Sequence, residues 1–239
     1  MGCASARSIL PIIARETPER SARALAESAR ASRAECSVVA RDAESGSDTS
    51  VDYRSIIDYY HGVNGSKPNV REASERDAEA CAAIYAPYVT DTAITFESDP
   101  PPPVEMARRI AAAVHTHAWV VLENKDRVVG YAYGGPFNSR VAYRWSCEVS
   151  VYLERGRQRT GGGRALYDAL FARLAERGFR TAVAGMTLPN DASVGLHRAM
   201  GFEPVGTYRR IGWKHNRWHD VAWTQRTITM GQDPPAEPR

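Results

Sequence analysis

Glu148 and the glycine-rich loop that follows it are the residues of this chain best suited to chemistry. Glu148 lies in WSCEVSVYL, residues 145–153, where apolar and polar side chains alternate as they do in a half-buried strand. The alternation places Glu148 on the more polar face, where a carboxylate can serve as a general base. Without the neighbouring loop, an ion-paired glutamate on a sheet surface would be the better interpretation.

The loop over residues 154–164 combines arginines with three consecutive glycines at 161–163. Apolar side chains then recur at helical spacing over residues 165–177, and Gly178 is suited to end that helix. Glycines at a helix N-terminus let backbone N–H groups converge where unpaired donors and the helix dipole favour an anion. A position between strand and helix therefore favours a phosphate-binding loop over a solvated surface turn.

Two common nucleotide motifs do not fit this loop. A dinucleotide fingerprint would need a third glycine where Leu166 stands, and a nucleoside-triphosphate loop would need Gly-Lys-Ser/Thr. The spacing Gln158-x-x-Gly161-x-Gly163 instead resembles the Q/R-x-x-G-x-G/A signature of the GNAT superfamily of N-acetyltransferases, whose loop holds the pyrophosphate of acetyl-CoA.

The resemblance extends over most of the chain, from Val70 to Arg226. This part is similar to the phosphinothricin N-acetyltransferases and their methionine-sulfoximine-acetylating relatives. The matching segments are TFESDP, AYGGPF, AYRWSCEVSVYL, LPNDASVGLHRAMGF and GWKHNRWHDV. Together these segments imply acetyl transfer from acetyl-CoA to an amine.

The resemblance implies two catalytic residues. Glu148 matches the glutamate that takes the proton of the amine, directly or through water. His197 matches the histidine that the phosphinothricin branch carries where many GNAT enzymes have the tyrosine that protonates the CoA sulfur. Alternation places Cys147 on the opposite face from Glu148, where we expect a buried thiol and no covalent acetyl-cysteine.

The resemblance also implies a binding site for acetyl-CoA. The end of the strand would offer backbone groups to the pantetheine and acetyl carbonyl, the loop would hold the pyrophosphate, and one asparagine matches a further contact. The residues concerned are Val151, Tyr152, Leu153, Gln158, Arg159, Thr160, Gly161, Gly162, Gly163, Arg164 and Asn190.

Three positions match the acceptor pocket of the family. Arg140 matches an arginine that faces the acidic end of the substrate, although a solvated loop arginine is about as good an interpretation. Phe96 matches an aromatic lining residue, although a core phenylalanine would look the same. Asn138 stands where phosphinothricin acetyltransferases have lysine, which removes one fixed charge.

The expected acceptor is therefore the α-amine of a small acidic amino acid or analogue, with methionine sulfoximine acetylated at least as well as phosphinothricin. Two alternatives stay open. The acceptor could be a peptide or protein amine, or the chain could be a non-catalytic acyl-CoA-binding module. The presence of both Glu148 and His197 argues against the second alternative.

Composition sets broader limits. The 239 residues carry a net charge of +3, with 43% hydrophobic residues, which allows one sizeable domain and gives no signal for nucleic acid. No apolar run approaches the roughly 18 residues of a membrane span. Four cysteines without C-x-x-C spacing favour a reduced, cytoplasmic setting, and the histidine pairs 115/117 and 215/219 lack further metal ligands. The sequence leaves the oligomeric state open, and a homodimer is compatible with it.

The elements that would position these residues form an α/β fold, the GNAT acyltransferase fold, with a mixed central sheet flanked by helices. We expect a poorly ordered extension over residues 1–68 with a helix at 17–33, a catalytic domain over 69–229, and a disordered tail over 230–239. Expected strands cover 69–73, 118–124, 127–135, 145–153, 181–188, 202–209 and 218–227. Expected helices cover 77–88, 165–177 and 191–200, with a further helix that follows residues 100–103 and runs through 113. Pro87 is expected to end or bend the first of these helices.

Overall fold

The computed structural model describes residues 39–41, 48–50, 69–157, 160–233 and 235–238. The chain divides into two units, Met1–Lys67 and Pro68–Arg239. In the first unit, β1 (Val39–Arg41) and β2 (Asp48–Ser50) pair antiparallel. The predicted helix over 17–33, and the predicted lack of order in the extension, fall on residues outside those described.

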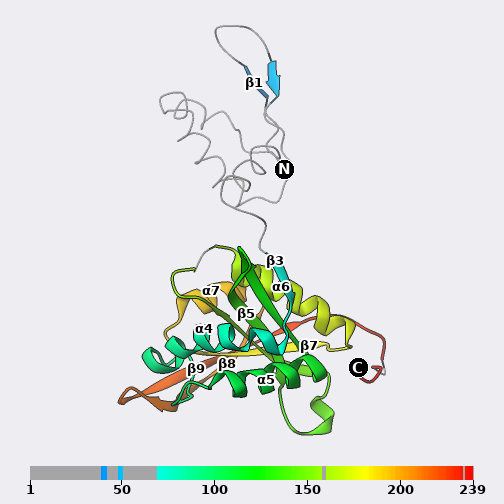
Figure 1. Ribbon diagram of the computed structural model, residues 1–239. Coiled ribbons are helices and arrows are strands. Elements are labelled where there is room, and N and C mark those ends of the chain that lie inside the picture. The colour runs from blue at the N-terminus through cyan, green and yellow to red at the C-terminus, as the bar shows by residue number, and fades with distance from the viewer. Residues whose placement is uncertain (1–38, 42–47, 51–68, 158–159, 234, 239) are drawn as a thin grey trace. The chain divides into compact units, whose positions relative to one another are not determined.

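The second unit is built on one sheet with helices packed against it (Figure 1). The sheet has seven strands in the order β3-β4-β5-β6-β7-β9-β8. Neighbouring strands are antiparallel except β6 and β7, which are parallel, so the predicted mixed sheet is confirmed. The strands are β3 (Asn69–Glu72), β4 (Ala118–Asn124), β5 (Arg127–Pro136), β6 (Ser146–Leu153), β7 (Thr181–Thr187), β8 (Glu203–Lys214) and β9 (Arg217–Thr227).

Helices cover both faces of the sheet. The helices are α4 (Ala78–Asp91), α5 (Pro103–Thr116), α6 (Gly162–Glu176) and α7 (Asp191–Ala199), with short 3-10 helices η2 (Glu75–Asp77) and η3 (Val141–Tyr143). On β4, Val120 packs in the cluster that contains the α6 side chain Leu170, whereas Val121 packs in the cluster that contains Ile110 of α5. Alternation along the strands therefore divides the core into an α6 side and an α4/α5 side.

Two local features differ from or refine the predictions. Gly178, with φ of 94°, ends α6 as predicted. The helix α4, however, continues through Pro87 to Asp91, so the proline does not end it. The carbonyl that loses its bond to Pro87 belongs to Ala83, which is exposed and can bond to water instead.

The C-terminal segment makes specific contacts in its described part. The Arg144 guanidinium donates to both carboxylate oxygens of Glu237 at 2.6 Å, and the Trp145 indole donates to the Ala236 carbonyl at 2.8 Å. These contacts place residues 236 and 237 beside the start of β6. Disorder of the tail as a whole stays a prediction.

Candidate active site

The sheet opens between its two parallel strands. β6 and β7 pair at Ser146↔Thr181, Cys147↔Ala182 and Glu148↔Val183, and no pair follows although β6 runs on to Leu153. On its other edge β6 stays paired with β5 as far as Leu153. The edge of β6 that faces β7 therefore presents unpaired backbone groups, which can bind an amide-containing chain as a further strand would.

The residues predicted to contact pantetheine, Val151, Tyr152 and Leu153, all lie along this open stretch of β6. The Leu153 carbonyl is already engaged, because it accepts the Tyr88 hydroxyl at 2.6 Å. The Tyr152 ring packs edge-on against Tyr85 and Tyr88 of α4, so its backbone rather than its side chain is available to a ligand.

The glycine loop leads directly from β6 into α6. Gly161, with φ of 83°, is the N-cap residue of α6 and adopts the left-handed conformation that glycine tolerates. A Cβ at Gly162 would lie 2.8 Å from Leu122 Cδ2, and one at Gly163 would lie 3.0 Å from Leu196 Cδ2. The glycines thus allow the helix start to pack tightly, with its first N–H groups free for an anion such as pyrophosphate.

Several polar side chains of the loop are bonded to other groups of the protein. Arg155 pairs with Asp91 at 2.9 Å, and Arg157 pairs with Glu154 at 2.8 Å. Thr160 donates to the Arg157 carbonyl, and Arg164 donates to the Ala199 carbonyl at 3.2 Å. Of the predicted loop contacts, Gln158 and Arg159 fall outside the residues that the structure describes.

Glu148 lies on the α4/α5 face of β6, opposite Gly135 of β5. Within the described residues its carboxylate has no hydrogen bond or ion pair, and burial raises the pKa of Glu148 above its ordinary value of 4.5. A half-buried carboxylate without a cationic partner is a stronger base than a solvated one. The neighbouring Cys147 is fully buried on the α6 side, where burial raises the pKa of its thiol to about 12, so the thiol is not a nucleophile.

His197 is buried, with 4% of its surface exposed. Its Nδ1 lies 2.8 Å from the Ser193 carbonyl, which can only accept, so Nδ1 carries the proton and Nε2 accepts from the Tyr167 hydroxyl at 2.9 Å. Burial lowers the pKa of His197, which keeps the imidazole neutral at pH 7. To protonate a thiolate, His197 would have to give up one of these two bonds.

The predicted contact residue Asn190 is the N-cap of α7. Its Oδ1 accepts the Ser193 backbone N–H at 3.1 Å, which leaves the Nδ2 group for a ligand.

The three predicted acceptor contacts do not share one cavity. The Phe96 ring covers Gly212 of β8 and lies 6.2 Å from the His219 ring. Asn138 and Arg140 are exposed in the loop between β5 and η3, where Asn138 Oδ1 accepts the Arg140 backbone N–H at 3.0 Å. Contact of these three residues with substrate stays a prediction.

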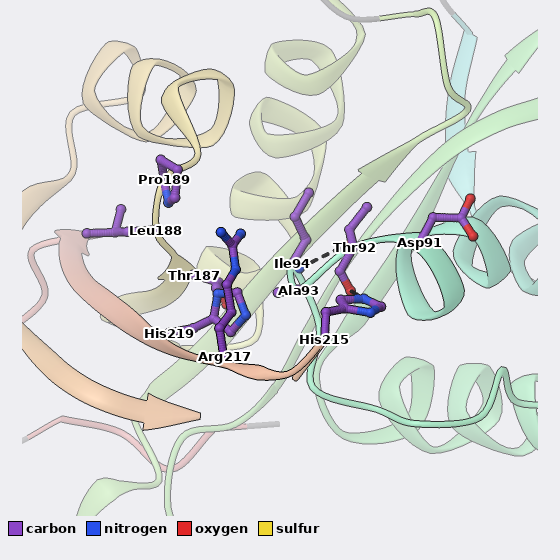
Figure 2. Close-up of a pocket in the computed structure, with 10 residues that line it drawn as sticks. All are labelled: Asp91, Thr92, Ala93, Ile94, Thr187, Leu188, Pro189, His215, Arg217 and His219. Carbon is purple, nitrogen blue, oxygen red and sulfur yellow. Dashed lines mark hydrogen bonds between the residues drawn. The ribbon is translucent and has the colours of Figure 1, made fainter. Parts of the chain in front are cut away.

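A cavity of about 580 Å³ lies beside the opening of the sheet (Figure 2). Its walls are residues 91–94 at the end of α4 and directly after it, residues 187–189 at the end of β7, and His215, Arg217 and His219 of the β8–β9 hairpin. Thr187 is on the same face of β7 as Val183, the partner of Glu148, so the cavity opens on the face that Glu148 occupies.

The sequence did not single out Lys214, which links the β8–β9 hairpin to the chain on either side of residues 91–94. Its ammonium donates to the carbonyls of Val89, Thr95 and Glu97 at 2.7, 2.8 and 2.9 Å. The chain has three lysines among 31 Lys and Arg residues. A compact ammonium with three donors suits three converging carbonyls better than a planar guanidinium does, so the rarity of lysine was the available signal.

The parallel strands that diverge beside a carboxylate, followed by a glycine-rich helix start, define an acyltransferase of the GNAT type. Residues 70–223 match the family model described as Acetyltransferase (GNAT) domain, and the chain belongs to this family. The predicted fold class is thereby confirmed.

The chain is similar to characterised enzymes over most of its length. It is 37% identical to a phosphinothricin N-acetyltransferase from Streptomyces viridochromogenes, over 71% of this chain and 91% of that protein. It is 31% identical to an L-methionine sulfoximine/L-methionine sulfone acetyltransferase from Pseudomonas paraeruginosa, over 70% and 98%. A phosphinothricin acetyltransferase from Sinorhizobium meliloti, solved in complex with AcCoA, matches with a TM-score of 0.66 and 33% identity, covering 71% of this chain and 96% of that one.

The chain is therefore an acetyl-CoA-dependent N-acetyltransferase. In the part of the chain that the structure describes, no group of His, Cys, Asp and Glu residues is arranged to hold a metal ion. The helices of that part are too short or too polar to cross a membrane.

Proposed function

We propose that this enzyme acetylates the α-amine of a small amino acid or amino-acid analogue of the phosphinothricin or methionine sulfoximine type. The observation that carries the proposal is the Glu148 carboxylate, which has no partner among the described residues and lies at the point where β6 and β7 separate. The substrates named for the relatives support the class of acceptor.

In the proposed reaction Glu148 removes a proton from the acceptor ammonium, directly or through a water molecule. The free amine then attacks the thioester carbonyl, and N–H groups on the open edge of β6 stabilise the negative charge on the carbonyl oxygen. The C–S bond breaks, an amide forms as the nitrogen loses its second proton, and the thiolate takes a proton. We propose His197 as the donor to the thiolate. Its neutral imidazole must then leave Tyr167 or the Ser193 carbonyl, and must take up the second proton of the nitrogen as it gives up its own.

The α-carboxylate of the acceptor needs a cation near this point. Arg217 lines the cavity beside the opening and has no ion pair among the described residues, whereas Asp91 in the opposite wall is paired with Arg155. Arg217 is therefore a better-placed partner than the predicted Arg140, which does not line this cavity. A guanidinium can bind the carboxylate through two parallel hydrogen bonds.

A thiol-release assay with acetyl-CoA tests the proposal. The panel contains phosphinothricin, methionine sulfoximine, methionine sulfone and a short peptide with a free N-terminus. We expect turnover with the free amino acids that exceeds turnover with the peptide. Release with the peptide and none with any free amino acid would refute the proposed acceptor class.

We further propose that residues 69–229 form the complete catalytic domain and that the enzyme acts as a homodimer in the cytoplasm, without nucleic-acid or membrane partners. Support for a dimer comes from β8, the outermost strand of the sheet, which exposes several large apolar side chains. The mild net charge of +3 supports the absence of a nucleic-acid partner.

A further inference from the structure

A second cavity, of about 610 Å³, lies between α5 and the strands β4 and β5. Its sheet side is formed by Trp119, Tyr131 and Tyr133. The Trp119 ring is stacked with both tyrosine rings, with centroid distances of 5.1 Å to Tyr131 and 4.5 Å to Tyr133. Met106 of α5 and Tyr85 of α4 complete an aromatic and apolar lining. Such a lining favours an uncharged group over an ionised one.

The arginines of this cavity are already neutralised. Arg109 donates to both oxygens of Glu97, at 2.8 and 3.1 Å, and to Glu105 at 2.9 Å. Arg108 donates to both oxygens of Glu105 at 2.8 Å. Burial lowers the pKa of His117, a further lining residue, to about 4, so that it is neutral at pH 7. An acidic ligand group would have to displace these ion pairs to find a cation.

Gly135 joins this cavity to the catalytic position. Gly135 lines the cavity and is the cross-strand neighbour of Glu148. Directly opposite residues of antiparallel strands project to the same face, so a side chain at position 135 would stand next to the carboxylate. A Cβ built at Gly135 would meet no heavy atom within 4 Å. The missing side chain leaves open space between Glu148 and the cavity.

We propose that the side chain of the acceptor passes over Gly135 into this cavity, and that the preferred acceptors carry an uncharged, apolar or aromatic side chain. The inference rests on the proposed function, because the acceptor amine must lie at Glu148. Position 135 is then a determinant of specificity: glycine admits a long side chain, and a branched residue would block it.

The test is Gly135→Val. The backbone of Gly135 is not in the left-handed region and its surroundings are open, so valine in this strand should fold without strain. We expect the wild-type enzyme to favour phenylalanine and methionine sulfone over glutamate and phosphinothricin. The variant should lose roughly 10-fold or more in kcat/KM for phenylalanine while changing little for alanine, with the KM for acetyl-CoA unchanged.

Two further variants make the result specific. Gly206→Val on β8 is the matched control, since a Cβ there also meets nothing within 4 Å and the residue does not line the cavity; its substrate preferences should equal those of the wild type. Ala112→Phe fills the same cavity from α5 and should reproduce the loss for phenylalanine. It also keeps the test decisive if Gly135→Val does not fold.

The inference and the proposed function are contradicted by different results. A wild-type preference for phosphinothricin or glutamate, or equal losses for alanine and phenylalanine in both cavity variants, would overturn the inference and leave the proposed function standing. Absence of turnover with every free amino acid in the wild type would overturn both.

Discussion

Glu148 differs from the other partly buried carboxylates of this protein. Asp77 and Glu97 each lie against an arginine whose hydrogen bonds hold the carboxyl pKa below its ordinary range, although burial opposes the shift. In the part of the chain that the structure describes, Glu148 is partly buried without such a partner, and burial raises its pKa. A carboxylate kept unpaired at a cost in stability is typical of a catalytic base.

Glu148→Gln preserves size and hydrogen-bonding capacity but removes the base. We expect kcat/KM at neutral pH to fall by roughly 10²- to 10⁴-fold, while acetyl-CoA binding is retained. In the wild type, the acid limb of the kcat/KM profile should lie above the position set by an ordinary glutamate, because activity is lost as pH falls through the raised pKa. Wild-type rates in the variant would remove Glu148 from the mechanism.

The same substitution should change stability with a defined sign. A raised folded-state pKa means that the protonated form is favoured on folding, so the contribution of Glu148 is fully present below its unfolded value of about 4.5 and is lost as pH rises through the folded pKa. At pH 7 the ionised side chain therefore destabilises the fold. Glu148→Gln should raise Tm at pH 7 and leave it nearly unchanged at pH 4, as calorimetry at the two pH values would show.

The sequence predicted the face of Glu148 and the burial of Cys147, because both follow from alternation along one strand. It did not predict that the Asn138 and Asn190 oxygens are used by the Arg140 and Ser193 backbone. Those bonds depend on the local geometry of a turn and of a helix N-cap, which the match to the family's binding residues does not reveal.

Among the elements, the loop of residues 92–97 depends on the β8–β9 hairpin. The hairpin reverses at His215 and Asn216, both with positive φ, which brings Lys214 and His215 next to the loop. The Lys214 ammonium donates to two carbonyls of the loop, those of Thr95 and Glu97, and to the Val89 carbonyl of α4. His215 Nε2 lies 3.2 Å from the Thr92 carbonyl. Since the loop and the hairpin form opposite walls of the cavity beside β7, these contacts set its width.

Lys214→Met keeps the apolar stem and removes the ammonium, which leaves three carbonyls without their donor. We expect the KM for the acceptor to rise about 10-fold or more, while the KM for acetyl-CoA changes little. Hydrogen exchange of the 92–97 amides should accelerate, a readout that does not depend on the choice of acceptor.

Lys125→Met in the β4–β5 turn is the matched control and should behave as wild type. Lys214→Arg should restore little of the acceptor affinity or of the exchange protection, because a planar guanidinium does not fit the three acceptors. Unchanged exchange in Lys214→Met would show that the loop is held by other contacts, such as Phe96 on Gly212.

The elements themselves were predicted well where periodicity is strong and less well at their ends. The strand predicted at 202–209 extends to Lys214, because register shifts between Pro204 and Gly206 and between Tyr208 and Gly212 keep it paired with β9 through an irregular stretch. The interval of residues 210–217 between the two expected strands reduces to a two-residue turn. Bulges interrupt the alternation on which strand prediction rests.

For the whole molecule, the sheet leaves one long edge without a partner in the described structure. β8 pairs only with β9, and Val205, Tyr208, Ile211 and Trp213 are exposed by 61, 60, 56 and 58%. An edge strand of this length with such side chains is a liability in a monomer. A second copy related by a twofold axis would cover it with the same surface.

A shortened chain that begins at Asn69 tests both the proposed catalytic domain and the proposed homodimer. Since the family match begins at residue 70, this shortened enzyme should keep its kcat/KM within a small factor of the full chain and should elute as a dimer with light-scattering detection.

Ile211→Arg in the same background places a charge in the proposed contact and should yield a monomer that still binds acetyl-CoA. Thr207→Arg, on the same strand, tests whether any charge on β8 has this effect, and should matter less if the apolar side chains make the contact. Loss of activity on truncation would show that residues 1–68 belong to the catalytic unit, and a monomeric parent would refute the dimer.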